Sequence, residues 1–186
     1  RKEQKDPKES KETGKEHKTA QYFAPKGIGD IPYLPPVPRE TIEKIAIKYN
    51  LPIPPEDTVF WEWFKDNKVI PLLIDEGAKK SLSAFSEDIV AIAIYGCQCG
   101  VDSQTGEIKE SLRPYVEDRD VYIGLDQDKK PKTRRTVNKA VKRLAKAMSK
   151  LNSRVYHVTW DAEDGKGVDD VIKNKGYITI GTSKDT

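Results

Sequence analysis

The pattern of apolar and polar positions changes at about residue 69, where continuous apolar runs begin to alternate with segments of helical spacing. The apolar runs predict strands covered on both faces, and they span 69–74, 89–95, 121–125 and 154–160, with a last one at 177–180. The segments between them predict helices at 78–86, 133–151 and 168–174. Strands that alternate with helices predict an α/β fold with a mainly parallel central sheet of about four strands and helices on both faces.

The residues before 69 follow other patterns. Residues 1–20 are rich in Lys and Glu and are expected to be disordered or weakly helical, and the prolines of 24–38 predict an extended linker. An amphipathic helix is expected at 39–50, followed by an aromatic cluster that includes Trp61 and anchors this region to the sheet. The predicted organisation is a tail and linker at 1–37, a helical extension at 38–68 and an α/β domain at 69–186. A polar insertion or loop is expected at 96–118.

The composition is that of a water-soluble protein, with 36% hydrophobic and 34% charged residues in a chain of 186. No apolar run approaches the ~20 residues of a membrane helix, so we expect no membrane partner. The two cysteines, Cys97 and Cys99, are too close for a useful structural disulfide, and a reducing, cytoplasmic setting is expected. Because the chain begins with an arginine, we expect it to be a fragment of a longer protein.

Positive charge is concentrated in one block, although the formal net charge is only +3. No acidic residue occurs between Asp128 and Asp161. The cations of the predicted helix in this block point away from its apolar stripe and predict sequence-independent contacts with nucleic-acid phosphates; they include Lys132, Arg134, Arg135, Lys139 and Lys142. The alternative is an ordinary solvated helix face.

Acidic residues follow the ends of two predicted strands, Glu76 after the first and Asp126 and Asp128 after the third. Residues two apart in an extended chain point to the same side, so both aspartates can face one ion. Mg²⁺ prefers oxygen ligands, and we expect the three carboxylates to hold it if the two strands are neighbours. The alternative is that Asp126 and Asp128 only cap the turn and helix that follow.

A second set of charged residues lies near the start of the predicted helix at 168–174. Asp169 is a further candidate metal or water ligand, or a carboxylate that complements the helix dipole. Lys166, between two glycines, is a candidate phosphate ligand, and so are Lys79 and Lys80 after Glu76. All three lysines can equally be ordinary surface residues.

These motifs resemble the Toprim family, which is shared by bacterial-type primases, topoisomerases of types IA and II and some nucleases. The resemblance rests on Glu76-Gly77 after one strand and Asp126-Gln127-Asp128 after a later one. It extends over residues 60–176 and is closest to the branch of unassigned function found in plasmid and phage replication proteins, often beside a helicase. The turn at 95–100 departs from that branch, which usually has an apolar residue, Pro and Gly there.

The resemblance implies a Toprim/Rossmann-like fold, a catalytic Glu76 acting as general acid/base or metal ligand, and Mg²⁺ or Mn²⁺ held by Asp126 and Asp128. It further implies DNA or RNA as the partner, in the form of a single-stranded template, and allows for a helicase domain in the same longer chain. Primase-type nucleotidyl transfer is the expected activity. The alternatives are a nuclease that uses the same metal site and a noncatalytic nucleic-acid-binding module of a replication protein.

Overall fold

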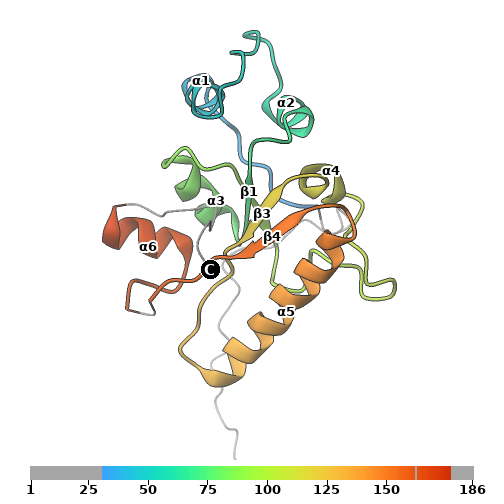
Figure 1. Ribbon diagram of the computed structural model, residues 1–186. Coiled ribbons are helices and arrows are strands. Elements are labelled where there is room, and N and C mark those ends of the chain that lie inside the picture. The colour runs from blue at the N-terminus through green and yellow to red at the C-terminus, as the bar shows by residue number, and fades with distance from the viewer. Residues whose placement is uncertain (1–30, 162, 177–186) are drawn as a thin grey trace, which may run out of the picture.

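The computed structural model describes residues 31–161 and 163–176, and within them four strands form one all-parallel sheet (Figure 1). The strands are β1 (Leu72–Glu76), β2 (Ala91–Ile94), β3 (Asp120–Ile123) and β4 (Arg154–His157), and their order is β2-β1-β3-β4. This arrangement confirms the predicted α/β fold. The expected tail at 1–20 and the expected strand at 177–180 lie outside the described residues.

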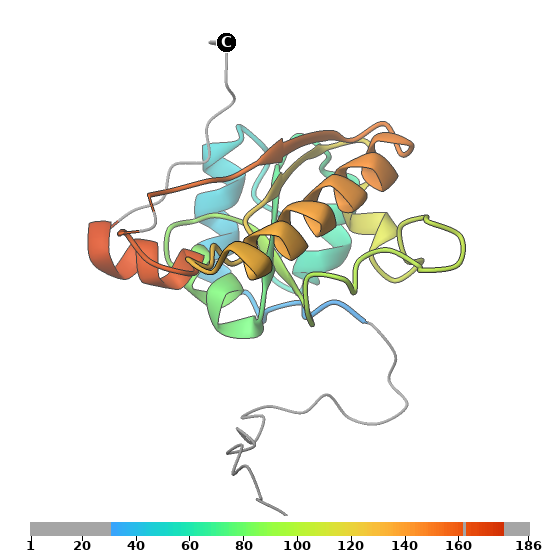
Figure 2. The same cartoon turned by 90° about the horizontal axis from the view of Figure 1, so that it is seen from below.

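The sheet separates two helical layers (Figures 1 and 2). Alternate residues of each strand face opposite sides. On one side, Leu73 and Tyr122 share an apolar cluster with helices α3 (Ala78–Phe85) and α6 (Val168–Lys175). On the other side, Ile74 and Ile123 pack in the main core with the buried stripe of α5 (Pro131–Ser149). The stripe includes the predicted Val137, Val141, Leu144 and Met148.

The strand order reverses between β1 and β3. The chain leaves β1 toward β2 on one side and later adds β3 and β4 on the other, while Ile74 and Ile123 remain register partners in the centre. In parallel sheets such a reversal opens a crevice at the carboxyl ends of the strands, where ligands bind. Glu76 ends β1 beside this crevice, and the segment from 124 to 128 leaves β3 on its other side.

Helices α1 (Arg39–Lys48) and α2 (Phe60–Asp66) lie at the end of the sheet where β1 begins (Figure 1). Their buried residues belong to the same core as the strands, so the expected boundary between residues 68 and 69 falls inside one continuous core. Trp61 packs against Phe85 and Tyr115, and its Nε1 donates to the Pro35 carbonyl at 2.9 Å. Trp61 therefore anchors the N-terminal region as predicted.

Two segments that were expected to be irregular contribute to the packing. Tyr33 and Ala93 exchange backbone hydrogen bonds, so the proline-rich segment covers the outer edge of β2. The expected loop at 96–118 contains α4 (Arg113–Val116) and buries four apolar side chains in the main core, Val101, Ile108, Leu112 and Val116. None of the described helices has the length and apolar character needed to cross a bilayer.

Arg119 joins α2 to the amino ends of β1 and β3. It is only 3% exposed, and its guanidinium donates to the carbonyls of Ile70 at 2.6 Å and Phe64 at 2.8 Å. The guanidinium carbon lies 3.7 Å from the centre of the Phe64 ring. Burial lowers the pKa of Arg119 to about 10, which leaves it charged at neutral pH. It therefore acts as a charged cross-link inside the core.

We expect Arg119→Met to lower the free energy of unfolding by about 3 kcal/mol, because two hydrogen bonds from a charged donor are lost and the Ile70 carbonyl loses its donor. Urea denaturation measures this. Arg113→Met is the matched control, because Arg113 is exposed and Glu117 is its one ion-pair partner among the described residues, so its loss should leave stability nearly unchanged. Equal effects of the two substitutions would contradict the cross-link.

Candidate functional site

The carboxyl end of β1 presents two acidic side chains on opposite faces of the sheet. Asp75 faces α3, where its Oδ1 accepts a hydrogen bond from Ser81 Oγ at 2.8 Å, and half-buried Glu76 follows on the other face. Gly77 has a φ of +103°, a backbone conformation that favours glycine, and it turns the chain directly into α3. One turn later, the Lys80 ammonium donates to the Glu76 carbonyl at 2.8 Å.

The Asp126 carboxylate lies between two ammonium groups. Lys80 Nζ is 3.0 Å from its Oδ1 and Lys166 Nζ is 2.9 Å from its Oδ2, while the Asp126 side chain is only 16% exposed. Oδ1 is itself buried and accepts no well-directed hydrogen bond. Asp126 is therefore a largely desolvated carboxylate whose charge is balanced by α3 on one side and by the loop before α6 on the other.

The backbone of Lys166 is fixed against the loop that carries Asp126. Its carbonyl accepts from the Gln127 N–H at 2.8 Å, and the N–H groups of Lys166 and Gly167 donate to Asp170 Oδ2 at 3.1 and 3.2 Å. A side chain at Gly167 would place its Cβ 2.3 Å from Lys80 Cε. Glycine at this position therefore lets the loop lie directly on Lys80.

The three carboxylates predicted to act together influence the same ammonium group. The hydrogen bond and charge of Asp126 raise the pKa of Lys166, and the charges of Asp128 and Glu76 raise it further. Burial raises the pKa of Glu76, and the negative charge of Asp126 adds to this. The condition for the predicted site, that the first and third strands are neighbours, is met, and the charges of Glu76 and Asp128 act on the same Lys166 ammonium group that contacts Asp126.

No group of three His, Cys, Asp or Glu side chains within 31–161 and 163–176 is already arranged to hold a metal ion. The donor chemistry nevertheless fits a hard divalent cation, because the acidic side chains offer only oxygen atoms and Oδ1 of Asp126 is a buried acceptor without a hydrogen bond. Cations already balance this carboxylate, in the form of two lysines. A metal held by Asp126, Asp128 and Glu76 would have to take the place of at least one of them.

Asp128 caps the turn before α5, and Asp169 lies in the first turn of α6, as the alternatives to a metal site predicted for these two residues. Asp128 Oδ1 accepts from the Lys130 N–H at 2.8 Å and so stabilises the turn before α5. Asp169, in the first turn of α6, is 14% exposed and pairs with Lys79 at 3.0 Å. Asp169 thus contacts α3 rather than the Asp126 loop.

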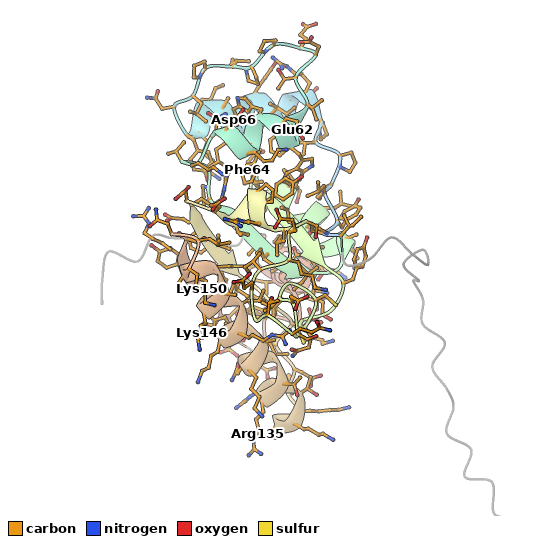
Figure 3. The ribbon with its side chains drawn as sticks, turned by 90° about the vertical axis from the view of Figure 1, so that its right-hand side faces the viewer. Glu62, Phe64, Asp66, Arg135, Lys146 and Lys150 are labelled. Atoms are coloured by element: carbon orange, nitrogen blue, oxygen red, sulfur yellow. The ribbon has the colours of Figure 1, made fainter. Side chains whose placement is uncertain are left out.

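The predicted phosphate ligands divide into two groups. Lys79, Lys80 and Lys166 pair with acidic residues of the site, whereas the predicted ligands at the start of α5 and along it are exposed. Figure 3 shows Arg135, Lys146 and Lys150 pointing outward along this helix; Lys132, Arg134, Lys139 and Lys142 are exposed on it as well. The exposed cations form a strip along α5 that begins beside the acidic cluster.

A cavity of about 490 Å³ connects Asp126 and Asp128 with the first turns of α5 and the end of β4. Its lining also includes the predicted phosphate ligand Arg134 and four residues without a predicted role, Asn138, His157, Thr159 and Trp160. His157 is exposed, because β4 is an edge strand. The position of β4 in the strand order, which local pattern does not give, determines this exposure.

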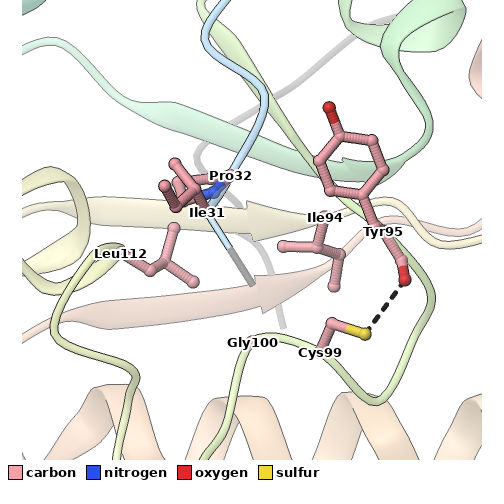
Figure 4. A pocket seen from close by; sticks show the side chains of 7 residues that line it. All are labelled: Ile31, Pro32, Ile94, Tyr95, Cys99, Gly100 and Leu112. Atoms are coloured by element: carbon pink, nitrogen blue, oxygen red, sulfur yellow. Dashed lines mark hydrogen bonds between the residues drawn. The ribbon is translucent and has the colours of Figure 1, made fainter. Parts of the chain in front are cut away.

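Cys99 lines a much smaller apolar pocket, of about 10 Å³, together with Ile31, Ile94 and Leu112 (Figure 4). Cys99 Sγ donates to the Tyr95 carbonyl at 2.9 Å. Both thiols are free and partly buried, and burial raises the pKa of each. The pocket has room for little more than a water molecule, so it does not form a ligand site.

Asp75 is a titratable residue without a predicted role. It is fully buried, and its Oδ2 has no hydrogen-bond partner among the described residues. Burial raises its pKa well above the ordinary value for aspartate, although the Ser81 hydrogen bond acts in the opposite direction. A protonated Asp75 removes one negative charge from beside Asp126.

Comparison with known proteins identifies relatives but no activity. The family model described as "Domain of unknown function (DUF3854)" matches residues 60–179, which is more than half of the chain. An uncharacterised protein of Picosynechococcus sp. (strain ATCC 27264 / PCC 7002 / PR-6) is 34% identical over 151 residues, which cover 75% of this chain. The match spans only 15% of that relative's own length. No solved structure matches the chain significantly.

The native protein should lose stability as pH rises and Asp75 ionises, and we expect Asp75→Asn to abolish this loss. A carboxyl group whose pKa is raised by folding contributes most below its unfolded pKa, and this contribution is lost as pH rises through the folded pKa. Asparagine keeps the acceptor for Ser81 and does not titrate. Chemical denaturation from acidic to neutral pH should therefore show the variant gaining stability relative to the native protein.

Asp102→Asn provides a control of opposite sign. Backbone hydrogen bonds from Thr105 and Gln104 lower the pKa of Asp102, so the native contribution of this residue grows with pH and the variant should lose stability relative to the native protein. The Asp75 assignment is wrong if Asp75→Asn follows the same trend as Asp102→Asn.

Proposed function

The chain belongs to the family described as Domain of unknown function (DUF3854), and we propose that it is a Toprim-like, Mg²⁺-dependent nucleic-acid enzyme. The activity that we favour is primase-type nucleotidyl transfer in plasmid or phage replication, in the cytoplasm. One observation carries the proposal. Asp126, which follows β3 beside the Glu76 end of the neighbouring strand β1, is a largely buried carboxylate with two lysine counter-ions, Lys80 at 3.0 Å and Lys166 at 2.9 Å.

The position of this cluster supports a ligand-binding role. It lies where the strand order reverses and at the carboxyl ends of the strands, the usual place for ligands in parallel sheets. Several carboxylates close together repel one another, and they persist where a cation balances them. A role in the fold alone would not require acids from both β1 and β3 at the edge where the crevice opens.

Asp126, Asp128 and Glu76 are the residues that would hold Mg²⁺ or Mn²⁺. When bound, a divalent cation supplies positive charge to the attacking and leaving oxygens of phosphoryl transfer. Glu76 has a raised pKa because of burial and Asp126, and a group titrating closer to neutral pH is better suited to accept and return a proton. Glu76 is therefore the proposed general acid/base.

The strip of cations on α5 supplies affinity for the polynucleotide backbone. Its residues are exposed, and Arg134 near its start lines the cavity that Asp126 and Asp128 also line. Phosphate contacts of this kind are independent of sequence and weaken with salt, which suits a template strand, DNA or RNA, that moves past a fixed site. Since the chain matches a small part of a much longer relative, a helicase domain in the same longer protein remains part of the proposal.

A noncatalytic nucleic-acid-binding module is the second candidate, and a specific contact favours it. Both oxygens of the Asp126 carboxylate are already paired with lysines, and no ready metal group is found in the described residues. If those ion pairs are permanent, the cluster only stiffens the loops, and binding would come from α5. Catalysis separates the two candidates.

We expect the native protein, with NTPs, a single-stranded template and Mg²⁺, to synthesise primers, and Glu76→Gln and Asp126→Asn to lower the rate by at least about 100-fold. Product formation on gels measures this. Asp66→Asn is the matched control, because Asp66 is exposed on α2, remote from the crevice (Figure 3). Plasmid nicking in Mn²⁺ without primer synthesis would assign the site to a nuclease. Undiminished binding without either activity would assign it to the binding module.

A further inference from the structure

The two lysines that contact Asp126 are held to very different degrees. The Lys80 side chain is 19% exposed, lies under Gly167 and makes a second contact, with the Glu76 carbonyl. The Lys166 side chain is 58% exposed, and Asp126 is its one ion-pair partner among the described residues. Lys80 is thus a fixed part of the site, and Lys166 is the cation that can leave.

The backbone of Lys166 cannot leave with its side chain. The Gln127 N–H and the Asp170 carboxylate fix it from both sides. A released ammonium group therefore remains within one side-chain length of Asp126, and exposed side chains change rotamer within nanoseconds. Because its backbone is fixed and its side chain can rotate, the Lys166 ammonium group can contact different anionic groups, but only close to Asp126.

A divalent cation at Asp126 would change which anionic group the Lys166 ammonium contacts. It would take Oδ2 from Lys166 and repel the ammonium group at short range. Protein-bound Mg²⁺ is commonly completed by substrate phosphate oxygens, and these would lie within reach of the displaced ammonium group. An ammonium–phosphate contact is a charge-assisted hydrogen bond, so the phosphate that accompanies the metal provides the new partner for Lys166.

We propose that Lys166 is an exchangeable counter-ion, which blocks Asp126 against metal in the free protein and moves to a substrate phosphate when metal binds. This inference rests on the proposed metal site at Asp126. Its consequence is that metal alone binds weakly, whereas metal and a phosphate-bearing strand bind cooperatively. Linkage requires that each ligand raises the affinity for the other by the same factor.

The test is the affinity for Mn²⁺, measured from the paramagnetic resonance signal of the free ion, with and without a short oligothymidylate that gels show to remain intact. Without oligonucleotide, Lys166→Met should bind Mn²⁺ at least about tenfold more tightly than the native protein, because the competing charge is gone. The oligonucleotide should raise the Mn²⁺ affinity of the native protein strongly and that of the variant much less. Lys166→Arg retains a competing cation and should restore native behaviour.

Lys129→Met is the matched control for net charge. Lys129 lines the same cavity as Asp126 but pairs with exposed Glu163. An equal gain in Mn²⁺ affinity for Lys129→Met would show a general charge effect and overturn the exchange. Equal affinities of native protein and Lys166→Met, with binding still abolished by Asp126→Asn, would overturn the exchange while leaving the metal site intact. If neither the native protein nor any variant binds Mn²⁺, both the proposed metal site and the proposed exchange are wrong.

Discussion

The ion pairs between Asp126 and the lysines at positions 80 and 166 hold the carboxyl edge of the sheet together. A carboxylate this far from water is costly unless opposite charge and hydrogen bonds compensate it. Here the compensation comes from α3 and from the loop before α6, segments that are distant in sequence. The acidic cluster therefore forms only when both have docked on the sheet, and the site depends on the complete α/β fold.

This requirement explains how four acidic residues coexist at two strand ends. Lys80 and Lys166 balance the charge of Asp126, and the buried environment of Asp75 disfavours its ionised form. Glu76 is an intermediate case. It is half-buried, and its pKa is raised by burial and Asp126 and lowered by the two lysines. The positive and negative charges at this edge of the sheet are thus nearly balanced without a ligand. A further cation can bind there only if one of the lysine ammonium groups moves away.

The sequence predicted the elements and the edge of the sheet that carries the site, because both depend on local pattern, but it left open whether the first and third strands are neighbours. Glu76 and Asp126 close apolar strands, and parallel strands bring their ends to one edge. The pairing of Lys166 with Asp126 was not predictable in this way, since a lysine between two glycines has no pattern that names a partner 40 residues earlier. The burial of Val101 and Ile108 in an otherwise polar segment was missed because these residues show neither strand nor helix periodicity.

The cavity beside the acidic cluster has negative charge at one end and positive charge at the other. Asp126 and Asp128 line one part of it and Arg134 another, and the exposed cations of α5 continue from there. A purely anionic ligand would meet repulsion at the acidic end, and a purely cationic one at α5. A polyphosphate or nucleic-acid strand accompanied by a divalent ion matches both ends at once, with the metal at the carboxylates and the phosphates toward the helix. The two halves of the charge pattern, which look contradictory when taken separately, are therefore consistent with one kind of ligand.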